Sequence, residues 1–277
     1  MGKDKGITPA KSMAIRLADA GTEETIENKI VVCEQIPALD VLRLALERSA
    51  NQIIQEKNPH WEAEMKASAI MLAAPRSFMD MPMATILSPD DLTPEAEKRV
   101  TEKEIVFSSS EEKNDVLESV NQTLRDFGCA DTFCSDVRLV ADELFTNAIF
   151  NAAFTHTKGI SRNQKVVVDK PCRIFIGRSE ERLVVGCEDP YGSLNIRKLL
   201  AQIRRCEEDG AQRAITWGMG GAGLGSYIVF QNAMSMFYGV EEGKRTIVAA
   251  IFPLGKGSRA RSKIAKSVHF IGIGKDE

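Results

Sequence analysis

The stretch from Val137 to Asn151 constrains the fold of this chain most, because it has the period of an amphipathic helix. Its apolar residues recur at steps of three and four and share one face: Ala141, Leu144, Phe145, Ala148, Ile149 and, just beyond, Ala152. Glu143, Asn147 and Asn151 lie four residues apart and form a ridge on a different face. One carboxylate and two amides can bind a hard cation and position a nucleophile. Taken alone, the ridge fits a surface helix with two incidental asparagines equally well.

Length and composition exclude several classes of protein. The chain has 277 residues, which suggests one large domain or two small ones. A formal net charge of -3 argues against a general nucleic-acid binder. No run of 18 apolar residues and no apolar signal core occur, so we expect neither a membrane span nor secretion. Six scattered cysteines without a Cys-x-x-Cys pair suit a reducing cytoplasm.

Residues 1–100 predict a mainly helical N-terminal region whose role stays open. Apolar residues at helical spacing predict helices over 38–55 and 61–74. Four prolines then interrupt residues 75–100, which indicates a linker or an irregular connection. The two helices would suit a sensor, a homodimer surface or a cover over a sheet.

Residues 101–254 alternate between strand and helix patterns. The expected order is strand, helix, helix, several strands, helix, loop, helix and strand. The long helix is expected from Asp131 to about Thr157, and a later one over 224–236. This order predicts an α+β domain, a two-layer sandwich of a mixed, mainly antiparallel sheet with helices on one face. A basic tail, 255–277, follows, in which 268–273 would add an edge strand.

A carboxylate stands at the end of one predicted strand. Asp189 follows the apolar run 184–188, and a turn through Pro190 and Gly192 comes next. A carboxylate fixed at a strand end can accept a hydrogen bond from an exocyclic amine such as that of adenine. An ordinary Asp-Pro turn is the simpler interpretation of this stretch alone.

A glycine-rich loop precedes the last predicted helix. Five of the eight residues from Gly218 to Gly225 are glycine. Glycines let backbone N–H groups approach phosphate oxygens, and the start of a helix favours anions. A dinucleotide-binding fold would need this loop after the first strand of a βαβ unit, whereas here it lies near the end of the domain.

Together, the order and spacing of these stretches resemble the GHKL, or Bergerat-fold, ATPases, which include gyrase, the Hsp90 chaperones, histidine kinases and MutL. Residues 143–148 match their N box, 189–192 match the first glycine box in part, and 221–225 match the second glycine box. Residues 245–253 look like the closing strand. The resemblance covers roughly residues 103–254.

Within that superfamily the layout looks most like the serine/threonine kinases that regulate sigma factors. The resemblance implies Mg²⁺ and ATP as cofactors, and a sigma factor or an anti-anti-sigma-like regulator as protein partner. Glu143 would be the base toward a substrate hydroxyl, and Asn147 would ligate Mg²⁺. The residues implied to bind the nucleotide are Asn147, Asn151, Asp189, Gly192, Gly221, Gly223, Leu224, Gly225 and Thr246.

The sequence departs from this pattern at two places. Tyr191 and Ser193 stand where the first glycine box usually has glycines, and Asn151 stands where such kinases usually have histidine. These departures favour an alternative, a nucleotide-binding interaction switch with little or no turnover. A histidine-kinase catalytic domain is disfavoured, since no credible phosphoacceptor helix precedes residues 101–254.

Overall fold

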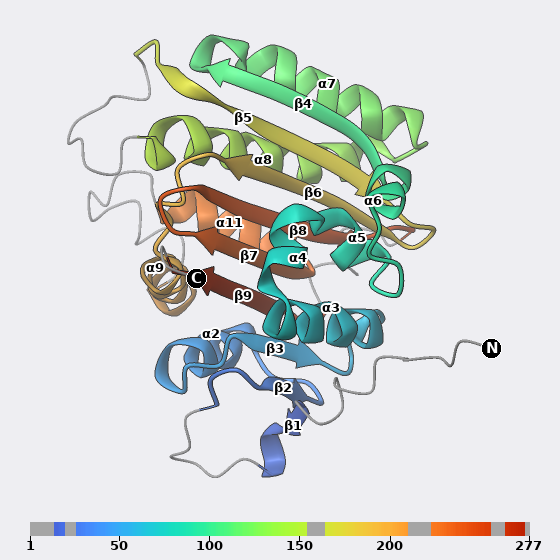
Figure 1. The fold of residues 1–277 in the computed structure, drawn as a ribbon, viewed down its shortest axis with the longest axis vertical. Coiled ribbons are helices and arrows are strands. Elements are labelled where there is room, and N and C mark those ends of the chain that lie inside the picture. Colours follow the sequence, from blue (N-terminus) through green and yellow to red (C-terminus); the bar gives the residue numbers. More distant parts are fainter. Residues whose placement is uncertain (1–13, 20–25, 154–163, 210–222, 256–263, 275–277) are drawn as a thin grey trace.

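The computed structural model describes residues 14–19, 26–153, 164–209, 223–255 and 264–274. Their strands form one sheet in the order β1-β2-β3-β9-β7-β8-β6-β5-β4 (Figure 1). The strands are β1 (Ala14–Arg16), β2 (Ile30–Cys33), β3 (Gln52–Gln55), β4 (Thr101–Ser109), β5 (Val167–Arg178), β6 (Arg182–Asp189), β7 (Ser235–Glu241), β8 (Arg245–Pro253) and β9 (Ser267–Ile273). Pairs β1–β2, β2–β3 and β7–β9 are parallel and the rest antiparallel, which confirms the mixed, mainly antiparallel sheet.

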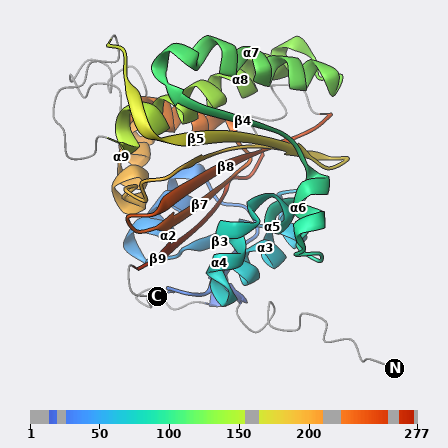
Figure 2. The same cartoon turned by 45° about the horizontal axis from the view of Figure 1, so that its top comes forward.

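Helices cover both faces of the sheet (Figure 2). Those described within residues 101–254 all lie on one face, as predicted, and the helices of residues 61–100 cover the other face. The helices on one face are α2 (Ala38–Glu47), α7 (Lys113–Asp126), α8 (Asp131–Thr146), the π-helix η3 (Asn147–Ala152), α9 (Ile196–Asp209) and α11 (Leu224–Asn232). Those on the other face are α3 (Trp61–Ala73), α4 (Pro75–Asp80), α5 (Pro82–Leu87) and α6 (Pro94–Val100). Short 3-10 turns occur at η1 (Leu17–Asp19) and η2 (Ser110–Glu112). None of the described helices is both long and apolar enough to cross a membrane.

The central strands are apolar on both sides because each side packs against helices. In β6, Leu183 and Val185 join the core under α8, while Val184 joins the core under α4 and α5. In β8, Phe252 joins the core under α8, and Ile251 joins the core under α4 and α5. This two-sided burial explains the continuous apolar runs in the sequence.

The N-terminal region contains strands as well as helices. The helix predicted over 38–55 ends at Glu47, and Ser49 adopts a positive φ of 56° that turns the chain into β3. Residues 75–100 form three short helices rather than a linker. Each begins with a proline, which suits the first helical turn because its missing N–H would have no partner there: Pro75, Pro82 and Pro94.

Strand β5 is irregular, and helix α11 is shorter than predicted. Residues 167–178 form a single strand, and its pairing with β4 shifts register near Pro171, which cannot donate a ladder hydrogen bond. The helix predicted over 224–236 ends at Asn232, and β7 follows it. A hairpin turn joins β5 to β6.

Strand β9 lies inside the sheet and not at its edge. It pairs in parallel with β7 and antiparallel with β3, so the C-terminal segment joins the N-terminal strands to the rest of the sheet. Buried polar side chains hold this junction. The carboxylate of Glu64 on α3 accepts hydrogen bonds from Asn58 Nδ2 at 2.9 Å and from the Ser235 hydroxyl, and lies 3.6 Å from His269 Nε2.

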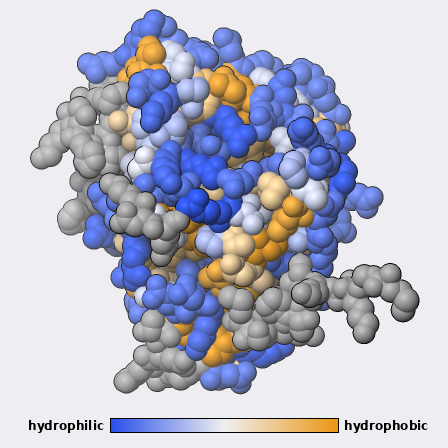
Figure 3. All heavy atoms as spheres, in the orientation of Figure 1, coloured by the Kyte–Doolittle hydropathy of each residue, from blue (hydrophilic) through white to orange (hydrophobic). Residues whose placement is uncertain are grey.

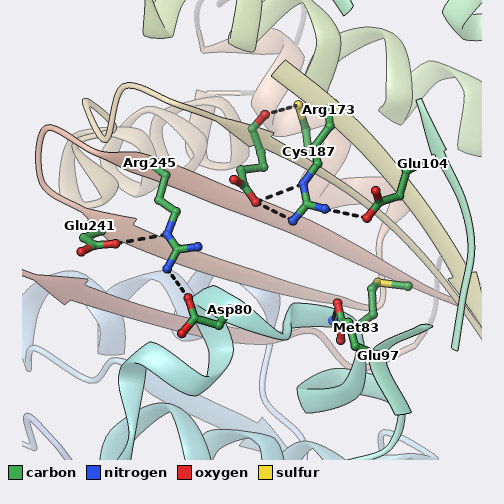
Figure 4. A network of polar contacts seen from close by, with 9 residues as sticks. Asp80, Met83, Glu97, Glu104, Arg173, Cys187, Glu241 and Arg245 are labelled. Atoms are coloured by element: carbon green, nitrogen blue, oxygen red, sulfur yellow. Dashed lines mark hydrogen bonds and ion pairs between the residues drawn. The ribbon is translucent and has the colours of Figure 1, made fainter. Parts of the chain in front are cut away.

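Ion pairs cover the sheet where α4–α6 leave it open. Arg173 lies between Glu188 and Glu104, at 2.8 and 2.5 Å (Figure 4). Arg245 bridges Asp80 and Glu241 in the same way, at 2.5 and 3.1 Å. Figure 3 shows that this face is largely hydrophilic, with limited apolar areas.

Candidate functional site

The predicted Glu-Asn-Asn ridge lies where an α-helix becomes a π-helix. Helix α8 ends at Thr146, and residues Asn147 to Ala152 form η3. The expectation of one α-helix to about Thr157 is therefore wrong at the turn that carries the asparagines, and residues 154–163 lie outside the described residues. The amide of Asn151 donates to Asn147 Oδ1 at 2.5 Å. Single π-turns inside α-helices occur frequently at functional sites.

A cavity of about 410 Å³ lies between this π-helix and the sheet, with α9 and α11 as its other walls. Its volume falls in the range of small-molecule sites. The cavity brings together four residues that the sequence singled out, from three different elements: Asn147, Asn151, Asp189 and Thr246. Apolar side chains such as Val248 and Leu199 make up much of the remaining wall.

Asp189 ends β6 and lies opposite Thr246 of β8. Its side chain is only 8% exposed. Burial raises its pKa to about 6, although the hydrogen bond from the Tyr191 N–H acts in the opposite direction. At neutral pH the cavity therefore holds a poorly solvated carboxylate, which is a strong hydrogen-bond acceptor.

The turn after β6 requires glycine at its centre. Gly192 has a φ of 58°, and a Cβ there would overlap the carbonyl oxygen of Glu241. The Gly243 N–H donates to the Gly192 carbonyl at 3.2 Å. Gly192 does not line the cavity; it packs the turn against the β7–β8 hairpin and so fixes the end of β6, where Asp189 lies.

The two residues that replace the usual glycines make contacts of their own. The Tyr191 hydroxyl donates to Asp169 Oδ1 of β5 at 2.8 Å, and Tyr191 is not part of the cavity lining. It therefore neither stacks inside the cavity nor blocks it. The Ser193 hydroxyl donates to the Ala152 carbonyl at 3.0 Å, which joins this turn to the end of η3.

Helix α11 brings the end of the glycine-rich stretch to the site. Gly223 is its N-cap residue and accepts a bond from the Tyr227 N–H at 3.1 Å, and Leu224 begins the helix. Ser226, in the first turn, lines the cavity. Gly221 lies outside the described residues. Backbone N–H groups of a first helical turn have no partner within the helix and favour an anion.

Glu143 and Gly225 face each other. A Cβ at Gly225 would overlap the carboxyl group of Glu143, so glycine lets α11 approach α8 closely. Both residues line a second hollow of about 560 Å³, together with Lys113 and Asp142. Glu143 is not among the residues that line the 410 Å³ cavity, although Phe150 lines both spaces. The structure thus places the acid beside the cavity that holds the asparagines.

Sequence reasoning missed several cavity residues. Tyr238 and Met236 belong to β7; the predicted helix covered only the first two residues of this strand, and no strand was predicted for the rest. Lys198 and Gln202 lie on α9, where their four-residue spacing gives a polar ridge that could have indicated a shared role. Lys198 is exposed, and its cationic side chain stands at the cavity wall.

A metal ion would find few protein ligands at this site. Among the described residues, no group of three His, Cys, Asp or Glu side chains could hold one. The amide oxygens of Asn147 and Asn151 are hard donors on the cavity wall. Such a set fits Mg²⁺, which usually keeps several waters and is held mainly through substrate phosphates.

Comparisons with known proteins give little guidance. No protein-family model matches the chain, and no curated protein matches it. Among solved structures, the chain is similar to one in the crystal structure of the SiaB-SiaC complex from Pseudomonas aeruginosa, with a TM-score of 0.41 and 17% identity. That likeness covers 57% of this chain and 94% of that chain. This structural likeness is too slight to assign a fold family or a function to the chain.

Proposed function

We propose that this protein binds Mg²⁺ and ATP in the 410 Å³ cavity and transfers the terminal phosphoryl group to a Ser or Thr hydroxyl of a protein partner. The observation that carries the proposal is the buried Asp189 carboxylate in a cavity that also contains two amides of η3. The order of the motifs along the chain, which resembles that of the Bergerat-fold ATPases, supports the same assignment.

Asp189 suits the amino group of adenine. Its carboxylate is desolvated and accepts a hydrogen bond from the Tyr191 N–H at 3.0 Å. An anionic acceptor stabilises the 6-amino group of adenine and repels the 6-oxo group of guanine or hypoxanthine. Apolar neighbours, including Val248 and Met236, would cover the faces of the base.

The phosphates of the nucleotide would lie against α11 and α9. The first turn of α11 lines the cavity through Ser226, and Lys198 adds a positive charge from α9. Asn147 would ligate Mg²⁺ there, with Asn151 fixing the Asn147 amide through their hydrogen bond. Bound Mg²⁺ would neutralise phosphate charge during transfer.

Binding is tested by calorimetry with Mg²⁺ and ATP, ITP or GTP. The wild type should bind ATP more tightly than ITP or GTP. Asp189→Asn should lose roughly tenfold or more of its ATP affinity, because a hydrogen bond to a charged acceptor is lost. Glu188→Gln is the matched control, since its side chain points to the opposite face of β6, toward Arg173. No heat with ATP in the wild type would refute the proposal.

Phosphoryl transfer depends on Glu143, which would accept the proton of the substrate hydroxyl. A labelled-ATP assay should use candidate regulators of the sigma-factor and anti-anti-sigma type as acceptors. Glu143→Ala should abolish transfer and leave ATP binding nearly unchanged, since Glu143 lies outside the cavity. Glu118→Gln, on the exposed side of α7, is the control and should retain transfer.

One observation favours a second candidate function. Glu143 lines the neighbouring hollow and packs against Gly225, apart from the residues of the cavity. A protein built this way can bind a nucleotide and change its affinity for a partner without turnover. Tight ATP binding with no transfer to any acceptor, together with partner binding that depends on ATP, would establish this switch in place of the kinase.

A further inference from the structure

Tyr238 carries a hydroxyl group in a wall where a phenylalanine would pack equally well. It lies on β7, is 2% exposed and lines the 410 Å³ cavity. Its neighbours on the cavity side include Met236 and Val248, which are apolar. Burial raises the pKa of its phenol, and no hydrogen bond or nearby charge offsets that effect.

The other two tyrosines of the chain differ in this respect. The Tyr191 hydroxyl bonds to Asp169, and that of Tyr227 bonds to Glu207. Within the described residues, Tyr238 has no such partner. A hydroxyl group that lines a cavity and has no protein partner is available to a bound ligand.

We infer that Tyr238 is a specificity-determining residue whose hydroxyl donates a hydrogen bond to a ring nitrogen of the bound base. This inference rests on the proposed nucleotide function. Asp189 lies on the same face of the sheet, at the end of β6, and Tyr238 lies two strands away on β7. Adenine bound through its 6-amino group to Asp189 has an acceptor nitrogen on either side of that amine, N1 and N7. A phenolic donor deeper in the cavity would complete the recognition of that edge.

Asp189 and Tyr238 would recognise two different groups on the edge of the base. Asp189 selects an amine over a carbonyl at position 6, whereas Tyr238 requires an unprotonated ring nitrogen beside it. An anionic acceptor and a neutral donor at adjacent positions match the edge of adenine and do not match that of a 6-oxopurine at N1. The site would then discriminate against analogues that lack the nitrogen as well as those that lack the amine.

The test is a double-mutant cycle between protein and ligand. Calorimetry compares wild type and Tyr238→Phe with ATP, 1-deaza-ATP and 7-deaza-ATP, all with Mg²⁺. Tyr238→Phe should weaken ATP binding about 2- to 13-fold, the range for one neutral hydrogen bond. One deaza analogue should bind wild type as weakly as ATP binds the variant, and it should lose nothing further in Tyr238→Phe.

A second variant controls for the loss of a tyrosine hydroxyl group in general. Tyr191→Phe is the matched control, since it removes a hydroxyl that bonds outside the cavity, and its ATP affinity should stay at the wild-type value. The analogue comparison on the wild type alone still tests the contact if a variant fails to fold.

The outcomes separate the two levels of the proposal. ATP binding by the wild type with equal affinity in Tyr238→Phe overturns the role of Tyr238 and leaves the nucleotide site intact. Equal loss of affinity for ATP and for both deaza analogues in the variant also overturns it, because the effect would then be one of packing. A wild type that binds no adenine nucleotide refutes both the site and this inference.

Discussion

Replacing Asp189 by asparagine should stabilise the ligand-free protein at neutral pH. Burial raises the pKa of Asp189 from 3.8 to about 6, so the folded state favours the protonated carboxyl. The stability that this group contributes is therefore fully present below its unfolded pKa and is lost as the pH rises through about 6. A shift of about two units corresponds to ~3 kcal/mol at pH 7. Asparagine carries no charge and keeps an oxygen for the Tyr191 N–H.

The assay is urea unfolding of wild type and Asp189→Asn between pH 4 and pH 8. The difference in unfolding free energy should be near zero at pH 4, grow between pH 4 and 6, and level off above pH 7. At its largest, ~3 kcal/mol corresponds to a melting-temperature rise of roughly 6–12 °C. Lost hydrogen bonds to the charged form would reduce this value, so it is an upper limit.

Asp209→Asn serves as the control, because this aspartate is exposed at the end of α9 and lies outside the cavity. A difference for Asp189→Asn that is the same at pH 4 and pH 8 would refute the reasoning, as would a variant less stable than wild type at pH 7. If the prediction holds, the same substitution that stabilises the protein should weaken ATP binding. Opposite effects of that kind are typical of functional sites.

Three further outcomes are expected. Gly225→Ala should displace the carboxyl group of Glu143 and reduce phosphoryl transfer more than ATP affinity, measured by labelled-ATP assay and calorimetry. Glu64→Ala should destabilise the protein by about 3–5 kcal/mol in urea unfolding, because it leaves His269 buried without its partner. Burial raises the pKa of Glu64, but the nearby His269 and the hydrogen bond from the Ser235 hydroxyl outweigh that effect and lower it, so this contribution should fade as the pH falls below 4.5. Lys198→Ala should weaken ATP binding more than adenosine binding, and the difference should shrink at high salt.

Local patterns singled out some of the cavity residues, whereas Gly192, Gly223, Leu224 and Gly225 are not among the residues that line the cavity. Asp189 ends a strand, and Asn147 and Asn151 repeat at a helical step, so each feature depends on a few neighbouring residues. The order of the motifs then indicated that they meet, and four of the proposed residues do line one cavity. Spacing could not show that the helix widens into a π-turn, nor that Glu143 lies in the adjoining hollow.

Long-range pairing explains what the sequence did not predict about the fold. Strand β9 is held by β3 and β7, which lie far away along the chain, so its own pattern suggested only an edge. In β7, every residue from Ser235 to Glu241 is buried, and the period-2 alternation that marks a half-exposed strand is therefore missing. The short helices of residues 75–100 form because the sheet offers them an apolar face, which their proline-rich sequence cannot reveal.

The walls of the site depend on both ends of the chain. Helix α9 packs on α2, where Arg204 pairs with Glu47 at 2.7 Å and Arg197 donates to the Leu46 carbonyl at 2.8 Å. Helix α11 is capped at its C-terminal end by Lys266, which donates to the Ala233 carbonyl. A ligand that shifts α9 or α11 must therefore change the free energy of packing of the terminal segments as well. By linkage, any change in that packing would change ligand affinity in return.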